Sequence, residues 1–334
     1  MINYIKIDAG SSVPKYRQLI NSFQEAIEGK VLIKGQKIPS INELSTTFKL
    51  SRDTILTAFY ELQAKGVITP KAGKGFYINN NKVTQEHKVF LLFDTLSAYK
   101  EQLLTAFKTE FSRKGSIDVH FHYFNTKVFE SLIRESIGNY TAYVIMPIPS
   151  KTVAPVIESI PQDKLYILDR GRRMFGHTYP SVCQSFRKDV YNSLSSGDHL
   201  IKKYKKLTLI FPDDGRAPMD LKRGFVQFCT EFNYEYAVTS RTDLEISHGE
   251  AYLAIDDSTL VNLVKQANEL KYLLGKDIGI ISYNDTPLKS IAANGITTIS
   301  TDFSEMGRSM ANLVINRQRQ HIDNPCRLIV RQSL

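Results

Sequence analysis

The sequence predicts an α/β protein in which a small N-terminal winged helix-turn-helix domain precedes a larger body built on parallel sheets. Three amphipathic segments followed by a glycine-rich hairpin fill residues 1–80, which is the pattern of a helix-turn-helix with a wing. From residue 89 onward strand and helix patterns alternate, as they do in parallel sheets covered by helices. The 334 residues are enough for two or three domains with full cores.

The first two helices are expected in residues 14–48. Helix one should run from about Pro14 to Glu28, because proline fits a first helical turn, where its missing N–H has no partner to lose. A short second helix should follow Ser40. Its hydroxyl can accept from the backbone of Glu43, while the Glu43 carboxylate returns a bond to Ser40, which makes a capping box.

The third helix and the wing are expected in the stretch KLSRDTILTAFYELQAKGVITPKAGKGFYI, residues 49–78. Ser51 is a good N-cap, and Gly66 suits the left-handed turn that closes the helix. The following segment reads as a strand, a basic glycine turn and a strand. In such a module the N-terminal residues of the third helix lie nearest the base edges of the major groove.

The positive charge of the chain is concentrated at the N-terminal end. Residues 1–82 hold twelve Lys and Arg against six Asp and Glu, so +6 of the net +9 lies there. Small domains can be basic by chance, but a basic module of this shape favours nucleic acid as its partner.

Cysteine spacing and hydropathy predict a cytoplasmic protein. Cys183, Cys229 and Cys326 are far apart and form no CxxC pair, which favours reduced thiols. We find no secretory signal and no apolar run long enough to span a membrane. His120 and His122 lack an evident third ligand, and the pair at residues 213–214 is interpreted as a turn. We therefore expect no metal, no cofactor and no catalytic residue.

The N-terminal segment resembles the DNA-binding domain of GntR-type bacterial transcription regulators. The matching positions are Gly29, Gly35, Ile38, Pro39, Ser40, Leu44, Ser51, Arg52, Thr54, Ile55, Leu62, Gly66, Val67, Gly73, Gly75 and Phe76. By this resemblance the contacts to phosphates or bases come from Ser40, Ser51, Arg52, Thr54, Lys71 and Lys74, with Lys74 at the tip of the wing. The sequence departs from the family at Asn42 and Leu56, where arginine is frequent, which leaves the operator sequence open.

The body places polar residues directly after its strand-like runs. Examples follow VFLLF, LYILD, AYLAID and IGIIS, and ligands of parallel sheets bind at the carboxyl ends of strands. Neither a phosphate-binding GxxxxGK(S/T) motif nor a GxGxxG motif occurs, which argues against kinases and dehydrogenases.

The body also resembles the periplasmic-binding-protein-like effector domain of LacI-type repressors. The resemblance is carried by VIMPIPS, LYILDRG, MDLKRGF, AIDDSTL, GIISYNDTP and GITTISTDFSEMGRSMANLVI. It implies a two-lobed fold that closes on an effector contacted by Asp94, Ser97, Tyr99, Asp169, Arg170, Arg223, Asp256 and Asn284. The family usually has aspartate at position 284, and Gln184 and Leu221 also depart from its pattern. Asp169 and Asp256 could instead cap strand ends.

The combination of the two parts resembles arabinose-type repressors. We expect a winged helix in residues 1–80, a linker in 81–88 and an effector domain in 89–334. The expected function is operator binding by a homodimer, controlled by a small effector that is most simply a monosaccharide. One alternative is a regulator that senses a phosphorylated sugar or a nucleotide. Another is a fusion to an aminotransferase-like enzyme, although about 250 residues are too few for that domain.

Overall fold

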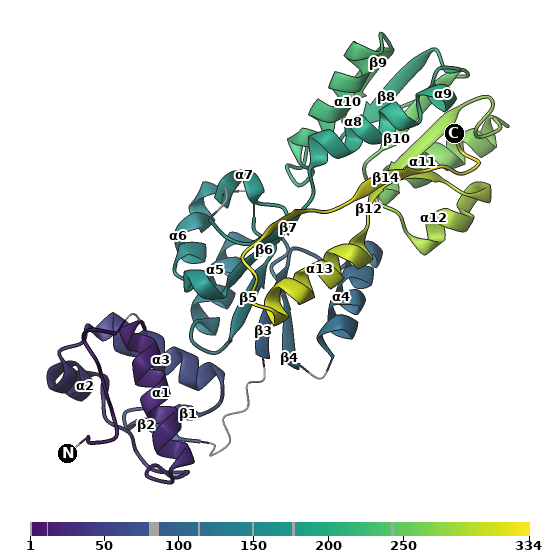
Figure 1. Cartoon of the computed structure of the whole chain (residues 1–334). Helices are drawn as coiled ribbons and strands as arrows, with labels where there is room; N and C mark the ends of the chain where they lie inside the picture. Colours follow the sequence, from purple (N-terminus) through teal and green to yellow (C-terminus); the bar gives the residue numbers. More distant parts are fainter. Residues whose placement is uncertain are drawn as a thin grey trace. The chain divides into compact units, whose positions relative to one another are not determined.

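The computed structural model describes residues 2–11, 13–79, 87–112, 114–148, 150–175, 178–241 and 244–334 (Figure 1). The chain forms two compact units, and each consists of several segments. The first unit contains Met1–Thr95, Phe111–Pro180 and Asn312–Arg319, and the second contains Leu96–Glu110, Ser181–Ala311 and Gln320–Leu334. Of the predicted linker, residues 81–86 lie outside the described residues, and the last two belong to strand β3.

The first unit begins with three helices and a hairpin. Their bounds are α1 Lys15–Glu28, α2 Ile41–Phe48, α3 Arg52–Ala64, β1 Ile68–Lys71 and β2 Gly75–Ile78. The two strands are antiparallel, with Ile68 opposite Ile78. Phe23 of α1 and Phe59 of α3 are fully buried, with ring centroids 6.0 Å apart. The predicted winged helix is confirmed, with one change at α1, where Pro14 is the N-cap instead of the first helical residue.

The rest of the first unit is an α/β layer. Its strands are β3 His87–Phe93, β4 Gly115–Phe121, β5 Ala142–Ile145 and β6 Leu165–Asp169. They are parallel and lie in the order β4-β3-β5-β6. Its helical segments are α5 Thr126–Ser136, η1 Lys151–Val153, α6 Ala154–Glu158, η2 Gln162–Lys164 and α7 Arg172–Phe175.

Strand β4 is shorter than the sequence suggested. The apolar and aromatic run VHFHYF, residues 119–124, has the pattern of a strand over its whole length, but β4 ends at Phe121. The two following aromatic residues, Tyr123 and Phe124, have φ angles of 48° and 58°, which no extended strand can accommodate.

The second unit is built on a six-stranded sheet in the order β14-β12-β11-β10-β8-β9. All neighbours in it are parallel except β12 and β14, which are antiparallel. The strands of this sheet are β8 Lys206–Ile210, β9 Glu235–Thr239, β10 Glu250–Ala254, β11 Gly279–Tyr283, β12 Thr297–Thr301 and β14 Cys326–Ile329. The strands β7 Ser181–Cys183 and β13 His321–Asp323 are parallel neighbours. The predicted α/β class with parallel sheets is confirmed.

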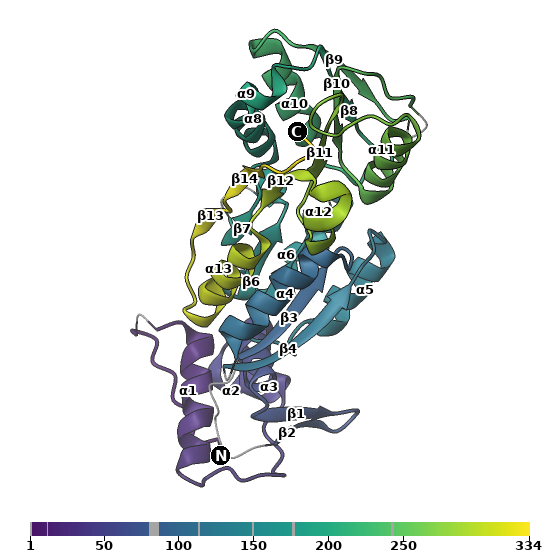
Figure 2. The same ribbon diagram turned by 90° about the vertical axis from the view of Figure 1, so that its right-hand side faces the viewer.

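The helices of the second unit have the bounds α4 Ala98–Phe111, α8 Phe186–Ser196, α9 Asp198–Ile201, α10 Met219–Glu231, α11 Asp257–Glu269, α12 Pro287–Ile291, η3 Ala292–Asn294 and α13 Phe303–Ile315, with the ends of α4 and α13 reaching into segments of the first unit. Helices α8 and α10 lie on one side of the sheet of the second unit and α11 lies on the other (Figure 2). No helix in the described part of the chain is both long and apolar enough to cross a membrane.

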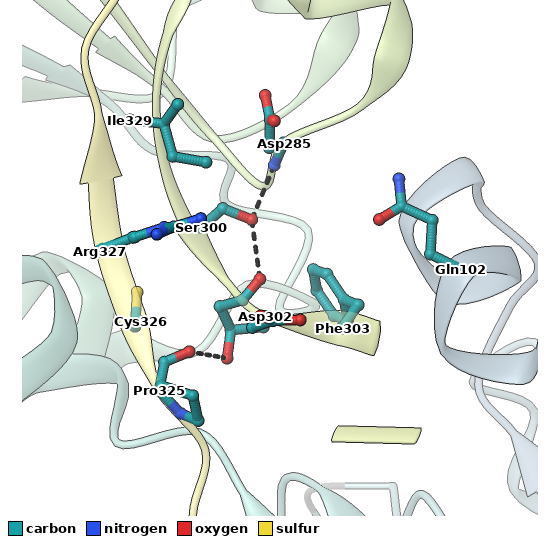
Figure 3. A pocket seen from close by; sticks show the side chains of 10 residues that line it. Gln102, Asp285, Ser300, Asp302, Phe303, Pro325, Cys326, Arg327 and Ile329 are labelled. Atoms are coloured by element: carbon teal, nitrogen blue, oxygen red, sulfur yellow. Dashed lines mark hydrogen bonds between the residues drawn. The ribbon is translucent and has the colours of Figure 1, made fainter. Parts of the chain in front are cut away.

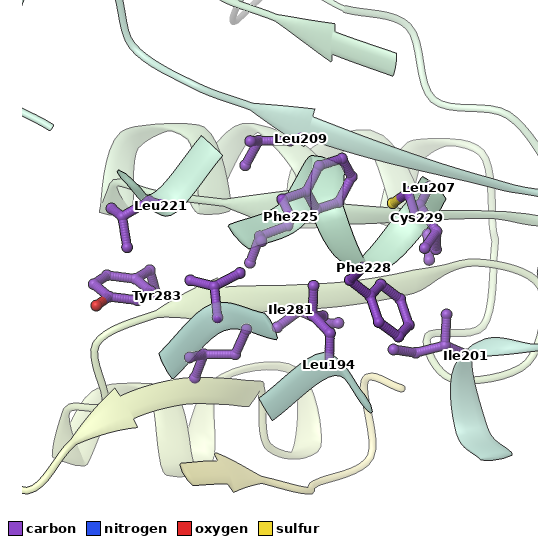
Figure 4. Close-up of a cluster of buried hydrophobic side chains, with 14 of the residues drawn as sticks. Leu194, Ile201, Leu207, Leu209, Leu221, Phe225, Phe228, Cys229, Ile281 and Tyr283 are labelled. Carbon is purple, nitrogen blue, oxygen red and sulfur yellow. The ribbon is translucent and has the colours of Figure 1, made fainter. Parts of the chain in front are cut away.

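A large apolar cluster lies between the sheet of the second unit and the helices α8 and α10 (Figure 4). Phe225 and Phe228 of α10 pack in it with Leu209 of β8. The two helices approach closely at Gly224, where an added Cβ would lie 2.4 Å from the carbonyl oxygen of Arg187. This packing gives the strands that carry the candidate effector loops a rigid support.

Candidate DNA-binding and effector sites

The N-terminal end of α3 is fixed by two of the predicted DNA-contacting residues. Ser51 is the N-cap, and its Oγ accepts the backbone N–H of Thr54 at 3.2 Å. The two hydroxyl groups also bond to each other at 2.8 Å. Ser51 is exposed and Thr54 is partly exposed. Both hydroxyls therefore shape the helix end that would enter a major groove.

Ser40 has the same role at the start of α2. Its Oγ accepts the N–H of Glu43 at 3.2 Å, and its own N–H donates to the Glu43 carboxylate at 3.4 Å. The predicted capping box is confirmed. Backbone N–H groups at the exposed N-terminus of a helix of this kind bind phosphate oxygens well.

Arg52, the first residue of α3, contacts a residue that was not among the predicted contacts. Its Nη1 donates to Oδ1 of Asn42 in α2 at 2.8 Å, and both side chains are exposed. In the sequence, Asn42 was noted only as a departure from the family, in which arginine is frequent at this position. Nothing in the sequence indicated that Asn42 and Arg52 pair.

The wing carries three lysines in the described hairpin and the segment beside it. The Nζ of Lys71 lies 4.4 Å from the ring centroid of Tyr77, and the turn at Lys74 is closed by its N–H to the carbonyl of Lys71 at 2.9 Å. Lys37 forms an isolated β-bridge with Tyr77. The sequence predicted a loop around Lys37, because a single bridge leaves no periodic pattern. All three lysines are exposed, so they can bind a phosphate backbone.

In the first unit, three predicted effector residues lie together. Asp94 follows β3 and Asp169 ends β6, and they are only 0% and 2% exposed. The guanidinium of Arg170 lies 3.6 Å from the Asp94 carboxylate and 4.0 Å from that of Asp169. It also lies 5.4 Å from the ring centroid of Phe124. Asp169 has a φ of 69°, a strained geometry for a non-glycine residue that is typical of functional sites.

In the second unit, two predicted effector residues keep buried polar atoms without partners. Oδ1 of Asn284 and Oγ of Ser97 are inaccessible to solvent, and neither atom has a hydrogen-bond partner in the described part of the chain. Asn284 also has a φ of 60°. Buried polar groups are nearly always satisfied, so an unsatisfied one at the end of a parallel strand indicates a place for a ligand.

The backbone on both sides of Asn284 is held by two cations that the sequence analysis missed. The Nζ of Lys289, a residue only 4% exposed, donates to the carbonyls of Tyr283 and Asn284 at 3.0 and 2.8 Å. Arg331 binds both carboxylate oxygens of Asp285, at 2.7 and 2.8 Å. Burial alone would raise the pKa of Asp285, but the hydrogen bonds from Arg331 and Thr298 lower it below its usual value.

The other three predicted effector residues make different contacts. Both carboxylate oxygens of Asp256 cap α11, accepting from the N–H and hydroxyl of Thr259 at 2.8 and 2.9 Å. Asp256 is therefore the N-cap of α11, a structural role close to the alternative interpretation of this residue as a cap at a strand end. The ring of Tyr99 packs on Phe303, with centroids 4.7 Å apart. Arg223 is exposed and pairs with Asp220 at 2.9 Å, beside a shallow groove on α8 and α10.

A cavity of about 250 Å³ lies beside β12 and β14 of the second unit (Figure 3). Asp285, Ser300, Phe303 and Arg327 are among the residues that line it, and none of the eight predicted effector residues does. The Oγ of Ser300 accepts the backbone N–H of Asp285 at 2.9 Å. This bond adds a third support to the loop that carries Asn284.

His122 and two of the cysteines show no feature of a metal-binding or nucleophilic site. One ring nitrogen of His122 lies 3.0 Å from the carbonyl of Met146, and the other accepts the N–H of Phe124 at 3.1 Å. Within the described ranges, no cluster of three His, Cys, Asp or Glu residues could hold a metal ion. Burial raises the pKa of the Cys229 and Cys326 thiols to about 12, so neither is an activated nucleophile.

Comparisons with known proteins identify both parts of the chain. Residues 9–78 match the model of bacterial regulatory proteins of the gntR family, and residues 198–334 match that of the periplasmic binding protein-like domain. The HTH-type transcriptional repressor YtrA of Bacillus subtilis is 34% identical over 99 residues, which are 30% of this chain and 72% of YtrA. The arabinose metabolism transcriptional repressor of Geobacillus stearothermophilus is 22% identical over 357 aligned positions, covering 97% of this chain and 96% of that protein.

Solved structures of similar fold belong to the LacI group. The trehalose repressor from Escherichia coli aligns with a TM-score of 0.63 at 14% identity, over 74% of this chain and 100% of that one. A LacI family regulator from Lactobacillus casei with bound glucose aligns with a TM-score of 0.60 at 13% identity, over 74% of this chain and 99% of that one. At these identities the likeness establishes the fold of the body.

A winged helix with a basic hairpin, fused to a body of this fold, defines a DNA-binding transcription regulator. The matched relatives and folds are regulators and not enzymes. The chain belongs to the gntR family of bacterial regulatory proteins and carries a periplasmic-binding-protein-like domain. The resemblance seen in the sequence is thereby confirmed.

Proposed function

We propose that this protein is a cytoplasmic repressor that binds operator DNA as a homodimer and whose affinity for the operator is set by a monosaccharide. In this proposal the DNA-binding domain comprises residues 1–80 and the effector domain comprises residues 89–334. The observation that carries it is the capped N-terminus of α3, which presents Arg52 beside a wing bearing Lys71 and Lys74. This arrangement offers base-reading and phosphate-binding groups on one small module.

The polar groups of the body support a sugar as the effector. Asp94, Asp169 and Arg170 in the first unit, and Ser97 and Asn284 in the second, are our candidate contacts. Carboxylates and amide oxygens accept hydrogen bonds from hydroxyl groups, and the unsatisfied Oδ1 of Asn284 needs such a donor. One sequence relative is named an arabinose metabolism repressor and one solved structure of similar fold is a trehalose repressor, and both names point to sugars.

A phosphorylated sugar or a nucleotide fits the cluster of Asp94, Asp169 and Arg170 less well than a neutral sugar does. The guanidinium of Arg170 already lies between two buried carboxylates, Asp94 and Asp169. These two carboxylates would compete with a phosphate for the guanidinium of Arg170. Arg223 and Asp256 remain predicted contacts, with the pairings described above.

A screen of melting temperatures tests the effector assignment. Purified full-length protein is heated with neutral monosaccharides, including L-arabinose and D-glucose, and with sugar phosphates and nucleotides. A neutral sugar should raise the melting temperature, because a ligand bound only to the folded state stabilises it. The Asn284→Ala and Asp94→Ala variants should each lose that shift. A shift produced by phosphorylated compounds alone would replace the monosaccharide with the alternative effector class.

Operator control is tested by measuring DNA affinity with and without the sugar found in the screen. Coupling of about 1–3 kcal/mol, a several-fold to hundredfold change, is typical of such regulators. The operator must change the affinity of the sugar by the same factor, because binding linkage is reciprocal. A sugar that binds while operator affinity stays constant would remove the regulatory mechanism from the proposal.

The homodimer follows from the small size of one winged helix. Two half-sites read by a two-fold dimer gain affinity because the second contact becomes intramolecular. Light scattering should give twice the mass of the 38.0 kDa chain at micromolar concentration. A monomer in the presence and absence of DNA would contradict this part of the proposal.

A further inference from the structure

The hydrogen bond between Arg52 and Asn42 joins the two helices of the helix-turn-helix on their solvent-exposed side. Nη1 of Arg52 donates to Oδ1 of Asn42 at 2.8 Å, across ten residues of sequence. Neither side chain contributes to the apolar core of the winged helix. The bond therefore contributes little to folding and instead orders the arginine at the end of the recognition helix.

Arg52 is the only basic residue in α3, whose sequence is RDTILTAFYELQA. One turn further on, Leu56 offers no charged or hydrogen-bonding group. A base contact made by α3 through a cation thus depends on this one guanidinium. A long arginine side chain samples many rotamers when free, and it discriminates bases best when its planar fork is already oriented.

Bonding through Nη1 leaves the other edge of the guanidinium, Nε and Nη2, available as a pair of parallel donors. Two parallel donors match the O6 and N7 acceptors of guanine in the major groove. The acceptor that holds Arg52 is neutral, so it adds no negative charge next to the phosphate backbone. The nearby acid Glu43 is occupied by the cap of α2.

We propose that Asn42 is a positioning residue that orients Arg52, so that α2 and α3 together read one guanine in each half-site. The inference rests on the proposed operator binding. It adds a specificity determinant outside the recognition helix.

The test uses full-length protein and selection from a random double-stranded DNA library, so that the wild type defines its own operator. Comparison with Arg52→Ala identifies the position at which the variant loses the preference for guanine. Affinities are then measured for the selected site and for three sites that carry each of the other bases at that position. Asn42→Ala should weaken binding to the selected site about threefold to tenfold. It should also reduce the preference for guanine at that position on the order of tenfold.

A double-mutant cycle separates positioning from general damage. If Asn42 acts through Arg52, the Asn42→Ala, Arg52→Ala double variant should bind within about twofold of Arg52→Ala alone. Asn42→Asp keeps an acceptor for Arg52 but places a negative charge near the phosphates. It should therefore retain the guanine preference while losing affinity at every site. Thr47→Ala, at another exposed position of α2, is the matched control and should change neither quantity.

The outcomes distinguish this inference from the function on which it rests. If the wild type enriches no sequence, operator recognition fails and the inference fails with it. If a sequence is enriched but Asn42→Ala keeps the full guanine preference, or if the two alanine effects simply add, operator binding stands and the positioning role of Asn42 is overturned.

Discussion

The recognition end of the winged helix and the loop that carries Asn284 present polar groups in opposite ways. At the N-terminus of α3 the hydroxyls of Ser51 and Thr54 bond to each other across three residues, and the neighbouring side chains are exposed. Around Asn284 part of the support comes from far along the chain, because Arg331 reaches Asp285 across forty-six residues. The amide oxygen of Asn284 itself is buried without a partner.

The difference indicates two ways of preparing a binding surface. A DNA-binding end that is exposed can be held by short-range caps and side-chain contacts, because the charged phosphates of DNA add a strong attraction of their own. A pocket for a small neutral molecule must hold a few acceptors in a fixed geometry before the ligand arrives. Here that role falls to the nearby Lys289 and the distant Arg331. Substitutions should consequently cost more stability in the body than at the recognition end.

Arg331→Ala should have the largest effect on stability. It removes two charge-assisted hydrogen bonds to Asp285, which together are worth about 1–3 kcal/mol at this partly exposed position. Chemical denaturation followed by circular dichroism measures the loss. Arg308→Ala breaks the more exposed pair with Glu305 and should cost about 0–1 kcal/mol. Equal losses in the two variants would remove the special role of Arg331.

Asp189→Asn should reveal a pH dependence that belongs to the body. Burial raises the pKa of Asp189 to about 6, with Asp323 adding to the shift. Because the folded state holds this proton more tightly than the unfolded state, the contribution of Asp189 to the stability of the wild type is complete below about pH 4 and is lost as the pH rises through 6. The variant lacks this titration but keeps an acceptor for the N–H of Ser185.

The gap between the two proteins should therefore grow by about 1–2 kcal/mol in favour of Asp189→Asn from pH 4 to pH 7. Denaturation midpoints at several pH values measure it. Parallel curves over that range would show that Asp189 keeps an ordinary pKa in the folded protein.

Ser51→Ala should have a smaller effect, confined to the winged helix. Loss of the N-cap leaves the N–H of Thr54 without its side-chain acceptor, which costs about 1 kcal/mol. Amide hydrogen exchange should be faster in α3 and unchanged in β10 and β11. Ser51→Asp should restore the cap, since aspartate is an equally good N-cap residue. Slower exchange or uniform loss of protection would contradict a local role.

Lys74→Ala should have the smallest effect, visible only with DNA. The side chain at the tip of the wing is exposed, so stability should not change measurably. Removal of one phosphate contact should lower the slope of log affinity against log salt by about one unit. Lys276→Ala, at an exposed loop position of the body, is the control and should leave the slope unchanged.

The parts of the fold set by neighbouring residues could be predicted from the sequence. The bounds of α2, its capping box and the left-handed turn at Gly66 agree with the structure because each depends on residues a few positions apart. The strand β9, EYAVT, was not predicted, because its side chains are only partly buried or exposed and it lacks a clear apolar run. The helix α8, FRKDVYNSLSS, was likewise missed, because polar residues separate its few apolar ones.

The candidate effector site could be predicted only in part. Asn284 and Asp169 were predicted as contacts because they come at the ends of apolar strand runs, and the structure places them at the ends of β11 and β6. Lys289 and Arg331 were missed, since a cation that supports a backbone carbonyl or a distant carboxylate leaves no local pattern. Asp256 shows the opposite limit: the same position after a strand suits a helix cap equally well, and its contacts are those of a cap.

The discontinuous composition of the two compact units has a consequence for how the protein is made. The first unit requires residues 312–319, and the second joins residues 96–110 to segments that begin at residue 181. A ribosome adds about 5–20 residues per second, so about two hundred residues of synthesis, or roughly 10–40 seconds, separate the emergence of residue 110 from that of residue 312. During that interval the apolar faces of β3 and β5 are synthesised but their unit is incomplete. Nascent chains stalled in the interval should therefore depend on chaperones, and truncations inside it should aggregate.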